Sequence, residues 1–305
     1  MTLSTSTCSI DPASEPECSK PLILRECLER WHNEAAHDVF DTGRYRCRTT
    51  VWGRGPALVL IPGIACESIV FAMLMARLQR FFRCITYELP NGIDDGARLR
   101  AYTHEDLATD LLALLDHLQI REATPLGFSF GSMVALEAMC REPDRFARGI
   151  LQGGFARRPL SRAEVFCATW ARFLPGRLAH VPFMRRILES NHREAFQARE
   201  PEVWDFFVAH YLRQPLSPFA SRAMLVHRFD ARNRLASLRQ PMLLVTGEND
   251  RIVGKSCADE LQRGLPRSAR AEIEQCGHVP HLTHPEVLAE IVQRFIGEWT
   301  AAMNA

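Results

Sequence analysis

Continuous apolar runs along the chain predict the strands of one sheet. Residues 57–61 (ALVLI) form a run typical of a central parallel strand covered on both faces, and residues 84–89 (CITYEL) have a similar character. Residues 45–52 are rich in β-branched and aromatic side chains, which favour a further strand. Runs at 149–154 (GILQGG) and 241–247 (PMLLVTG) predict two more strands.

Helix-spaced apolar residues lie between these runs. Residues 24–31 carry leucine and tryptophan at positions i, i+4 and i+7, which predicts a short amphipathic helix. Thr103 can cap a helix together with Asp106, and leucines line one face of residues 107–118. A last helix is predicted to begin at Pro285. Strands that alternate with helices predict βαβ units and therefore an α/β fold with a parallel sheet.

Residues 155–235 have a different character. They lack strand-like runs, so we expect a helical insertion over the sheet. The segment holds 14 arginines and 7 acidic residues, a local charge of +7. This charge either attracts an anionic substrate, carrier or phospholipid surface, or forms a solvated face. We expect its large side chains to supply the inner face of the insertion, where they line an apolar pocket or attach the insertion to the sheet: Phe166, Trp170, Phe173, Phe183, Met184, Trp204, Phe206, Phe207 and Tyr211.

Composition and charge narrow the class of protein. The 305 residues are 47% hydrophobic and 24% charged, as in ordinary globular chains, and the net charge of +1 argues against a nucleic-acid binder. The ten cysteines show no zinc-like spacing, and no apolar run reaches the roughly 18 residues of a membrane span. Residues 1–20 lack the features of a secretory signal and predict a disordered tail. We therefore expect a cytoplasmic protein with no stable membrane insertion.

The segment from Gly127 to Gly131 contains the pattern G-x-S-x-G, with Ser129 at its centre. A strand precedes the pattern and a helix-like stretch follows it. A sharp strand–turn–helix of this kind exposes the central side chain and requires small residues two positions before and after it. The pattern is short and can occur by chance, in which case Ser129 would be an ordinary loop serine between turn glycines. The rest of the sequence must therefore decide its role.

A serine nucleophile needs a base and a group that orients the base, and the later part of the chain offers both. Asp250 follows the predicted strand 241–247, and Glu248 is an alternative acid two residues away. His278 lies just ahead of the last predicted helix. Along the chain the candidate nucleophile Ser129 is therefore followed by the acid Asp250 and then by the base His278.

With these motifs in place, the sequence resembles the α/β-hydrolase family. The resemblance covers about residues 45–300 and rests on I-P-G-I, G-F-S-F-G, G-E-N-D-R-I-V and G-H-V-P-H-L in that order. It implies an α/β fold with a mostly parallel eight-stranded sheet, helices on both faces and a helical cap inserted after the sixth strand. The core would comprise 21–154 and 236–305, and the cap 155–235.

The same resemblance implies roles for single residues. Ser129 would be the nucleophile, His278 the general base and Asp250 the group that orients it. The backbone N–H groups of Phe130 and Ile64 would form the oxyanion hole, which stabilises the charge that develops on the substrate carbonyl oxygen. The chain departs from many relatives at Pro62-Gly63, where they have His-Gly, and in the loop 90–96. Pro125 also falls in the strand before the turn at Gly127–Gly131, which we call the elbow, so we expect that strand to be short or to contain a bulge.

Four other residues near these motifs have simpler interpretations. His281 and His284 repeat at three-residue spacing after His278, but no acid or cysteine pattern accompanies them, so packing or surface positions are favoured over a metal site. Ser132 is expected to be a small residue at the start of the elbow helix, and Cys66 a wall residue near the oxyanion hole.

These features predict a serine hydrolase that cleaves a carboxylic ester or related acyl bond through an acyl-enzyme, with no cofactor and no metal. Its expected partner is a small-molecule acyl substrate. An acyltransferase or a small-substrate aminopeptidase could use the same three residues, and a non-catalytic ligand-binding protein could keep them. The sequence does not distinguish acyl-chain lengths or oligomeric states.

Overall fold

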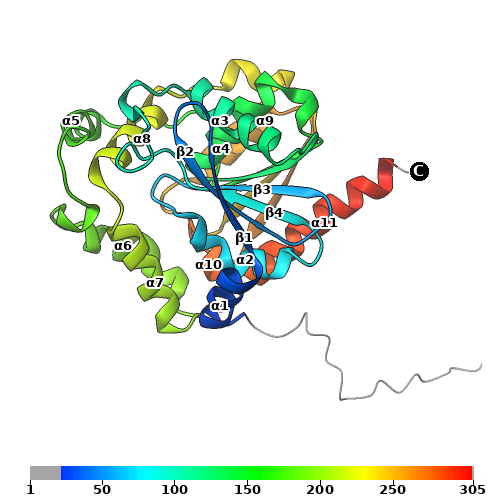
Figure 1. The fold of residues 1–305 in the computed structure, drawn as a ribbon, viewed down its shortest axis with the longest axis horizontal. Helices are drawn as coiled ribbons and strands as arrows, with labels where there is room; N and C mark the ends of the chain where they lie inside the picture. The colour runs from blue at the N-terminus through cyan, green and yellow to red at the C-terminus, as the bar shows by residue number, and fades with distance from the viewer. Residues whose placement is uncertain (1–21, 304–305) are drawn as a thin grey trace, which may run out of the picture.

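A computed structural model describes residues 22–303 of the chain, and residues 298–303 by their backbone alone. Within these residues eight strands form one sheet in the order β1-β2-β4-β3-β5-β6-β7-β8 (Figure 1). β1 and β4 each pair antiparallel with β2, and all other neighbours are parallel. The predicted tail, 1–20, lies outside the described residues. The strands are β1 (Ala36–Asp41), β2 (Arg46–Trp52), β3 (Ala57–Ile61), β4 (Arg83–Tyr87), β5 (Thr124–Phe128), β6 (Gly149–Gln152), β7 (Met242–Gly247) and β8 (Ser268–Ile273).

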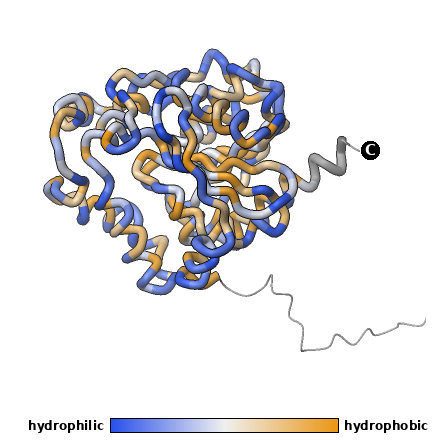
Figure 2. The backbone as a smooth tube through the Cα atoms, viewed as in Figure 1, coloured by the Kyte–Doolittle hydropathy of each residue, from blue (hydrophilic) through white to orange (hydrophobic). Residues whose placement is uncertain are grey.

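Helices cover both faces of the sheet. One layer consists of α1 (Leu24–Glu34), α2 (Ala72–Leu78), α10 (Pro280–Thr283) and α11 (Pro285–Met303), and the other of α3 (His104–His117), α4 (Phe130–Arg141) and α9 (Lys255–Gly264) (Figure 1). The central strands between these layers, such as β3, β5 and β7, are largely hydrophobic and buried (Figure 2). No helix in the described part of the chain is both long enough and apolar enough to cross a bilayer.

Four more helices lie between β6 and β7: α5 (Arg162–Ala171), α6 (Met184–His192), α7 (Pro201–Leu212) and α8 (Leu216–Arg228). They confirm the expected helical insertion after the sixth strand. Short 3₁₀ helices complete the chain: η1 (Ser68–Phe71), η2 (Leu99–Ala101), η3 (Pro143–Arg145), η4 (Leu178–His180), η5 (Arg193–Phe196) and η6 (Arg232–Ser237).

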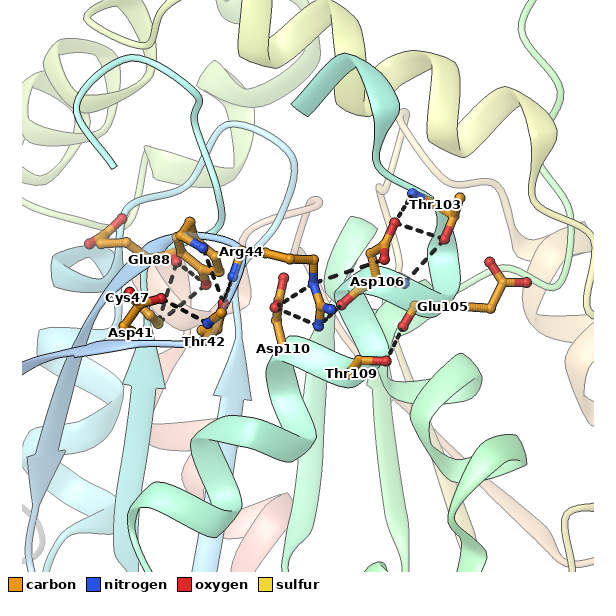
Figure 3. Close-up of polar contacts among 12 residues, drawn as sticks. Asp41, Thr42, Arg44, Cys47, Glu88, Thr103, Glu105, Asp106, Thr109 and Asp110 are labelled. Atoms are coloured by element: carbon orange, nitrogen blue, oxygen red, sulfur yellow. Dashed lines mark hydrogen bonds and ion pairs between the residues drawn. The ribbon is translucent and has the colours of Figure 1, made fainter. Parts of the chain in front are cut away.

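The predicted cap of α3 is confirmed. The Thr103 side chain accepts a hydrogen bond from the Asp106 N–H, and the Asp106 carboxylate accepts one from the Thr103 N–H (Figure 3). Arg44, in the β1–β2 turn, donates from Nε to Oδ1 of the buried Asp110 over 3.0 Å. This ion pair attaches the edge hairpin to α3.

The sequence did not predict β1 and β8, and both lie at the edges of the sheet. Along β1, Phe40 is the one buried side chain, and along β8 it is Ile273. Strands with so little buried surface have no apolar run to signal them. Pro125 lies inside β5, which has five residues, as β3 and β4 do. On one side β5 pairs with β3 from Thr124 to Gly127, and on the other side β6 begins to pair with it at Leu126, one residue after the proline.

Candidate functional site

Ser129 occupies a strained turn between β5 and α4. Its φ of 52° and ψ of −110° lie outside the regions that non-glycine residues favour. Both flanking glycines are needed for the turn to close. A Cβ on Gly127 would lie 2.5 Å from the carbonyl oxygen of Gly131, and a Cβ on Gly131 would lie 2.2 Å from that of Ile61. The predicted elbow geometry is therefore present around the serine.

Asp250 and His278 come together at the same edge of the sheet. His278 Nδ1 lies 2.7 Å from Asp250 Oδ2, while Asp250 Oδ1 accepts hydrogen bonds from the N–H groups of Ile252 (2.8 Å) and Val253 (2.9 Å). Burial acts to raise the pKa of Asp250, but the charge and hydrogen bond of His278 outweigh it, so the pKa lies below its ordinary value. The carboxylate is thus ionised and fixed in orientation.

The structure favours Asp250 over Glu248 as the partner of His278. Glu248 is exposed, and its Oε2 accepts a hydrogen bond from the N–H of Gln275 over 2.9 Å. The Glu248 side chain therefore stabilises the turn after β8. The Asp250 side chain, in contrast, is only 3% exposed and contacts the imidazole of His278.

The end of β6 brings Ser129 and His278 close to each other. The Ser129 N–H donates to the Gln152 carbonyl over 2.8 Å, and Gln152 Nε2 donates to the His278 carbonyl over 3.2 Å. A Cβ on Gly153 (φ 56°) would lie 2.9 Å from His278 Cε1, so this glycine leaves room for the ring. Among the described residues no hydrogen bond joins the Ser129 hydroxyl to His278, and such bonds often tighten only when substrate binds.

His192 is a buried neighbour of His278 that no motif in the sequence singled out. Their ring centroids are 6.4 Å apart, and His192 also packs edge-on against Phe207. Burial lowers the pKa of His192 to about 3. The ring is therefore neutral at pH 7 and does not oppose a positive charge on His278.

A cavity of about 720 Å³ opens above Ser129 and is lined mainly by apolar side chains. Ile64 and Phe130, the two residues expected to supply oxyanion donors, line it together with Ser129. The cap supplies most of the remaining wall, from residues that include Leu160, Ala168, Ala171, Leu178, Val181, Met184, Tyr211, Phe219 and Val226. The site can thus hold an apolar group next to the serine.

The expected inner face of the insertion is only partly correct. Met184 and Tyr211 line the cavity, and Trp204 and Phe207 are buried. Phe166, Trp170, Phe173 and Phe183 are instead exposed, each by more than half of its surface: 66%, 61%, 56% and 68%. For Phe166 and Trp170 the reason is that α5 packs against α8 through small residues such as Ala168, which leaves these two rings on the outside. Phe173 lies just after α5, and Phe183 at the start of α6.

Arg222 connects the cap to the loop that carries Ile64. This buried side chain on α8 donates from Nη1 to the Ile64 carbonyl (2.8 Å) and from Nη2 to the carbonyls of Leu89 (3.1 Å) and Pro90 (2.9 Å). Burial lowers the pKa of Arg222 to about 10, so the guanidinium is charged at pH 7. These bonds also fix the start of loop 90–96.

Glu67 makes a second connection between the same loop and the cap. It accepts hydrogen bonds from His210 Nδ1 (3.0 Å), Arg213 Nε (2.8 Å) and Gln214 Nε2 (2.7 Å), at the end of α7 and just beyond it. Burial acts to raise the pKa of Glu67, but the hydrogen bonds of His210 and Arg213 and the charge of Arg213 lower it to about 2.

Glu67→Gln is expected to destabilise the fold in a pH-dependent way. The pKa of Glu67 is lower in the folded chain than in the unfolded chain, so the ionised carboxylate stabilises the fold above the unfolded pKa. That contribution, about 2 to 3 kcal/mol of unfolding free energy, is lost as the pH falls from about 4.5 toward 2. Urea unfolding from pH 7 down to pH 3 should therefore show a gap between wild type and variant that closes in acid. A gap of constant size would contradict the assignment.

The other candidates near the motifs occupy structural positions. The Ser132 hydroxyl donates to the Ser129 carbonyl over 2.5 Å. Burial raises the pKa of the Cys66 thiol to about 11, which disfavours a reactive thiolate. His281 is buried against two phenylalanine rings. Among the described residues, no three His, Cys, Asp or Glu side chains form a group that could hold a metal ion.

Comparison with known proteins agrees with this architecture. A family model described as "alpha/beta hydrolase fold" matches residues 56–285. The pimeloyl-[acyl-carrier protein] methyl ester esterase of Xanthomonas campestris pv. campestris (strain B100) is 30% identical over 270 residues, which cover 81% of this chain and 97% of the relative. The uncharacterized hydrolase YugF of Bacillus subtilis (strain 168) is 25% identical over 247 residues, 78% of this chain and 89% of that one. A thermophilic esterase from Thermogutta terrifontis has a similar fold, with a TM-score of 0.76 and 22% identity over 87% of this chain and 99% of its own.

Proposed function

The chain belongs to the α/β-hydrolase fold family and is an enzyme of the hydrolase class, and on that premise we propose that it is a serine esterase for apolar acyl groups. The observation that carries the proposal is the 2.7 Å contact between His278 Nδ1 and Asp250 Oδ2, next to a serine held in a strained turn. Strain of this kind persists where function needs an exposed nucleophile.

The proposed mechanism assigns one step to each group. Ser129 Oγ attacks the ester carbonyl while His278 takes its proton, and the ionised Asp250 stabilises the imidazolium that forms. The N–H groups of Ile64 and Phe130 stabilise the tetrahedral oxyanion. His278 then gives its proton to the leaving alcohol, which departs from an acyl-enzyme on Ser129. A water activated by His278 releases the acid.

The shape and lining of the cavity support an apolar acyl group as substrate. A volume of about 720 Å³ falls in the range of small-molecule pockets, and its wall is mainly aliphatic and aromatic. The esterase names of the Xanthomonas campestris and Thermogutta terrifontis proteins support ester chemistry. An aminopeptidase would need a free acid in the wall to bind the substrate amine. Glu164 is an acid in the wall, but its carboxylate accepts a hydrogen bond from the Ser161 N–H over 2.8 Å at the start of α5.

Hydrolysis of p-nitrophenyl esters from acetate to laurate tests this proposal, with Ser129→Ala as the blank. We expect wild-type activity that rises from acetate to a medium-length chain, and a loss of at least about 10⁴-fold in the variant. Activity equal to that of the variant for every ester would contradict the proposal and would favour a binding protein on this scaffold.

Arg222→Met is expected to lower kcat by about 10- to 100-fold and to leave KM within about threefold, because small displacements of an oxyanion donor mainly weaken the transition state. The variant loses the hydrogen bond to the Ile64 carbonyl, so the Ile64 backbone is less well fixed. Steady-state kinetics on the preferred ester would measure both constants, and Arg222→Lys should recover part of kcat.

Arg213→Met is the matched control. Arg213 is also a cap residue that bonds to the loop carrying Ile64, but its partner there is the Glu67 carboxylate and not the Ile64 carbonyl. This variant should reduce stability and leave kcat within about threefold, as expected for a partly exposed ion pair. Equal loss of kcat in both variants would show that loosening of the cap, and not the position of Ile64, limits turnover.

A further inference from the structure

The large apolar side chains that are exposed in the described part of the chain are concentrated on the cap. Six of the eleven lie between residues 166 and 187: Phe166, Trp170, Phe173, Leu174, Phe183 and Ile187. Figure 1 shows α5 and α6 at the margin of the molecule, with α8 between α5 and the sheet. A concentrated apolar surface of this kind indicates an interaction site, whereas scattered single residues do not.

Helix α5 is apolar on two sides. Val165, Ala168 and Ala171 pack with residues of α8. Phe166 and Trp170 lie one helical turn apart on another side, with their ring centroids 6.4 Å apart, and Phe173 continues this stripe at the i+7 position just after the helix. The stripe is largely exposed: Phe166, Trp170 and Phe173 are among the most exposed large apolar side chains in the described part of the chain. Of these three rings, only that of Phe173 has a ring or cation–π partner from another described segment, the guanidinium of Arg100, which lies 5.0 Å from the ring centroid.

The exposed surface is continuous with the cavity above Ser129. Leu174 and Ile187 line that cavity and are still 53% and 49% exposed, so they form its rim. At the start of α6, Phe183 adopts a φ of 62°, an unfavourable conformation for a bulky residue, and its ring remains exposed. Strained backbone that holds an apolar ring in water points to a function for that ring.

Arginines border the same surface. Residues 161–190 carry five arginines and two glutamates, and both glutamates are engaged within the cap: Glu164 caps α5, and Glu189 pairs with Arg185. The guanidinium groups of Arg172 and Arg186 lie over the rings of Phe173 and Phe183, at 5.1 and 5.8 Å. Two copies of this surface brought face to face would oppose arginine to arginine, which disfavours self-association.

We propose that the outer stripe of α5 and the N-terminal end of α6 bind the surface of an anionic lipid bilayer. Aromatic and aliphatic side chains flanked by arginine are the composition of interfacial helices: the apolar groups enter the boundary between headgroups and acyl chains, and the arginines contact lipid phosphates. The rim of the cavity then faces the bilayer, so apolar molecules pass between lipid and cavity without crossing water. This proposal does not depend on catalysis by Ser129.

Sedimentation with vesicles tests the proposal. The full chain is mixed with vesicles of equal parts phosphatidylcholine and phosphatidylglycerol, or of phosphatidylcholine alone, at 50 and 500 mM salt. We expect binding to the anionic vesicles, a blue shift of Trp170 fluorescence, and loss of binding at high salt.

The triple variant F166S/W170S/F173S should bind at least tenfold more weakly, and R185Q/R186Q should bind about 25-fold more weakly, which is about fivefold for each of the two arginines. Phe81→Ser with Val287→Ser removes two exposed apolar side chains outside the cap and should bind like wild type.

The assay separates the bilayer from other occupants. The proposal is overturned if the wild-type chain binds neither kind of vesicle. It is also overturned if the α5 triple variant binds anionic vesicles as tightly as wild type. If the chain instead binds an acidic acyl-carrier protein, or forms a dimer that the triple variant abolishes, the surface is a protein interface and the proposal is also overturned. Ser129→Ala should bind vesicles like wild type, so failure of the esterase assignment would leave this result unchanged.

Discussion

His278→Ala is expected to slow ester hydrolysis by about 10⁴- to 10⁶-fold while the fold is retained. Without the imidazole, no group at the site can take the proton of Ser129 Oγ, and an unionised serine is a poor nucleophile. The ring is also the partner of Asp250 Oδ2, so its loss leaves that buried oxygen without its hydrogen bond, and a modest loss of thermal stability is expected as well.

Added imidazole makes the His278→Ala test specific. The alanine variant has a space the size of the missing ring beside Gly153, so exogenous imidazole should restore part of kcat in proportion to its concentration. His117→Ala is the matched control, because His117 pairs with Asp38 on the exposed surface at the end of α3, and it should retain wild-type kinetics. Activity of His278→Ala within tenfold of wild type would remove His278 from the mechanism.

Residues that lie close together in the sequence allowed much of the fold to be predicted. The apolar run 57–61 corresponds to β3, the capping pair at Thr103 starts α3, and the last helix begins at Pro285, as expected. Each of these signals is local, because it depends on burial of a short run or on a bond between residues three apart. The edge strands β1 and β8 gave no such signal because each has only one buried side chain.

Contacts between distant segments could not be predicted in the same way. Arg222 is one of 14 arginines in the insertion, and nothing in the sequence near it indicates that it reaches Ile64, 158 residues away. Gly153 likewise reads as an ordinary glycine after a strand, and only the fold places it against the ring of His278. The exposed stripe of α5 shows the same limit, because helical periodicity gives the faces of a helix but not which face the neighbouring helix covers.

Asp250→Asn is expected to reduce kcat by about 10⁴-fold with little change in stability. The structure gives a specific reason. Oδ1 of residue 250 accepts hydrogen bonds from the N–H groups of Ile252 and Val253, and an asparagine oxygen would keep both bonds. The amide nitrogen would then replace Oδ2 opposite His278 Nδ1 and donate to it. The imidazole proton would be forced onto Nε2, so this nitrogen could no longer accept the proton of Ser129.

Glu248→Gln is the matched control for Asp250→Asn, since Glu248 lies two residues away and bonds to the Gln275 N–H instead of to His278. It should retain kcat within about threefold, in keeping with the small effects of exposed surface positions. The kcat loss in Asp250→Asn should shrink as the pH is raised, because a wrongly protonated imidazole is bypassed when hydroxide removes the serine proton directly. A mild effect of Asp250→Asn combined with a severe effect of Glu248→Gln would transfer the orienting role to Glu248. Severe loss in Asp250→Asn alone, with unchanged urea unfolding, would show that the aspartate acts through the tautomer of His278 and not through the fold.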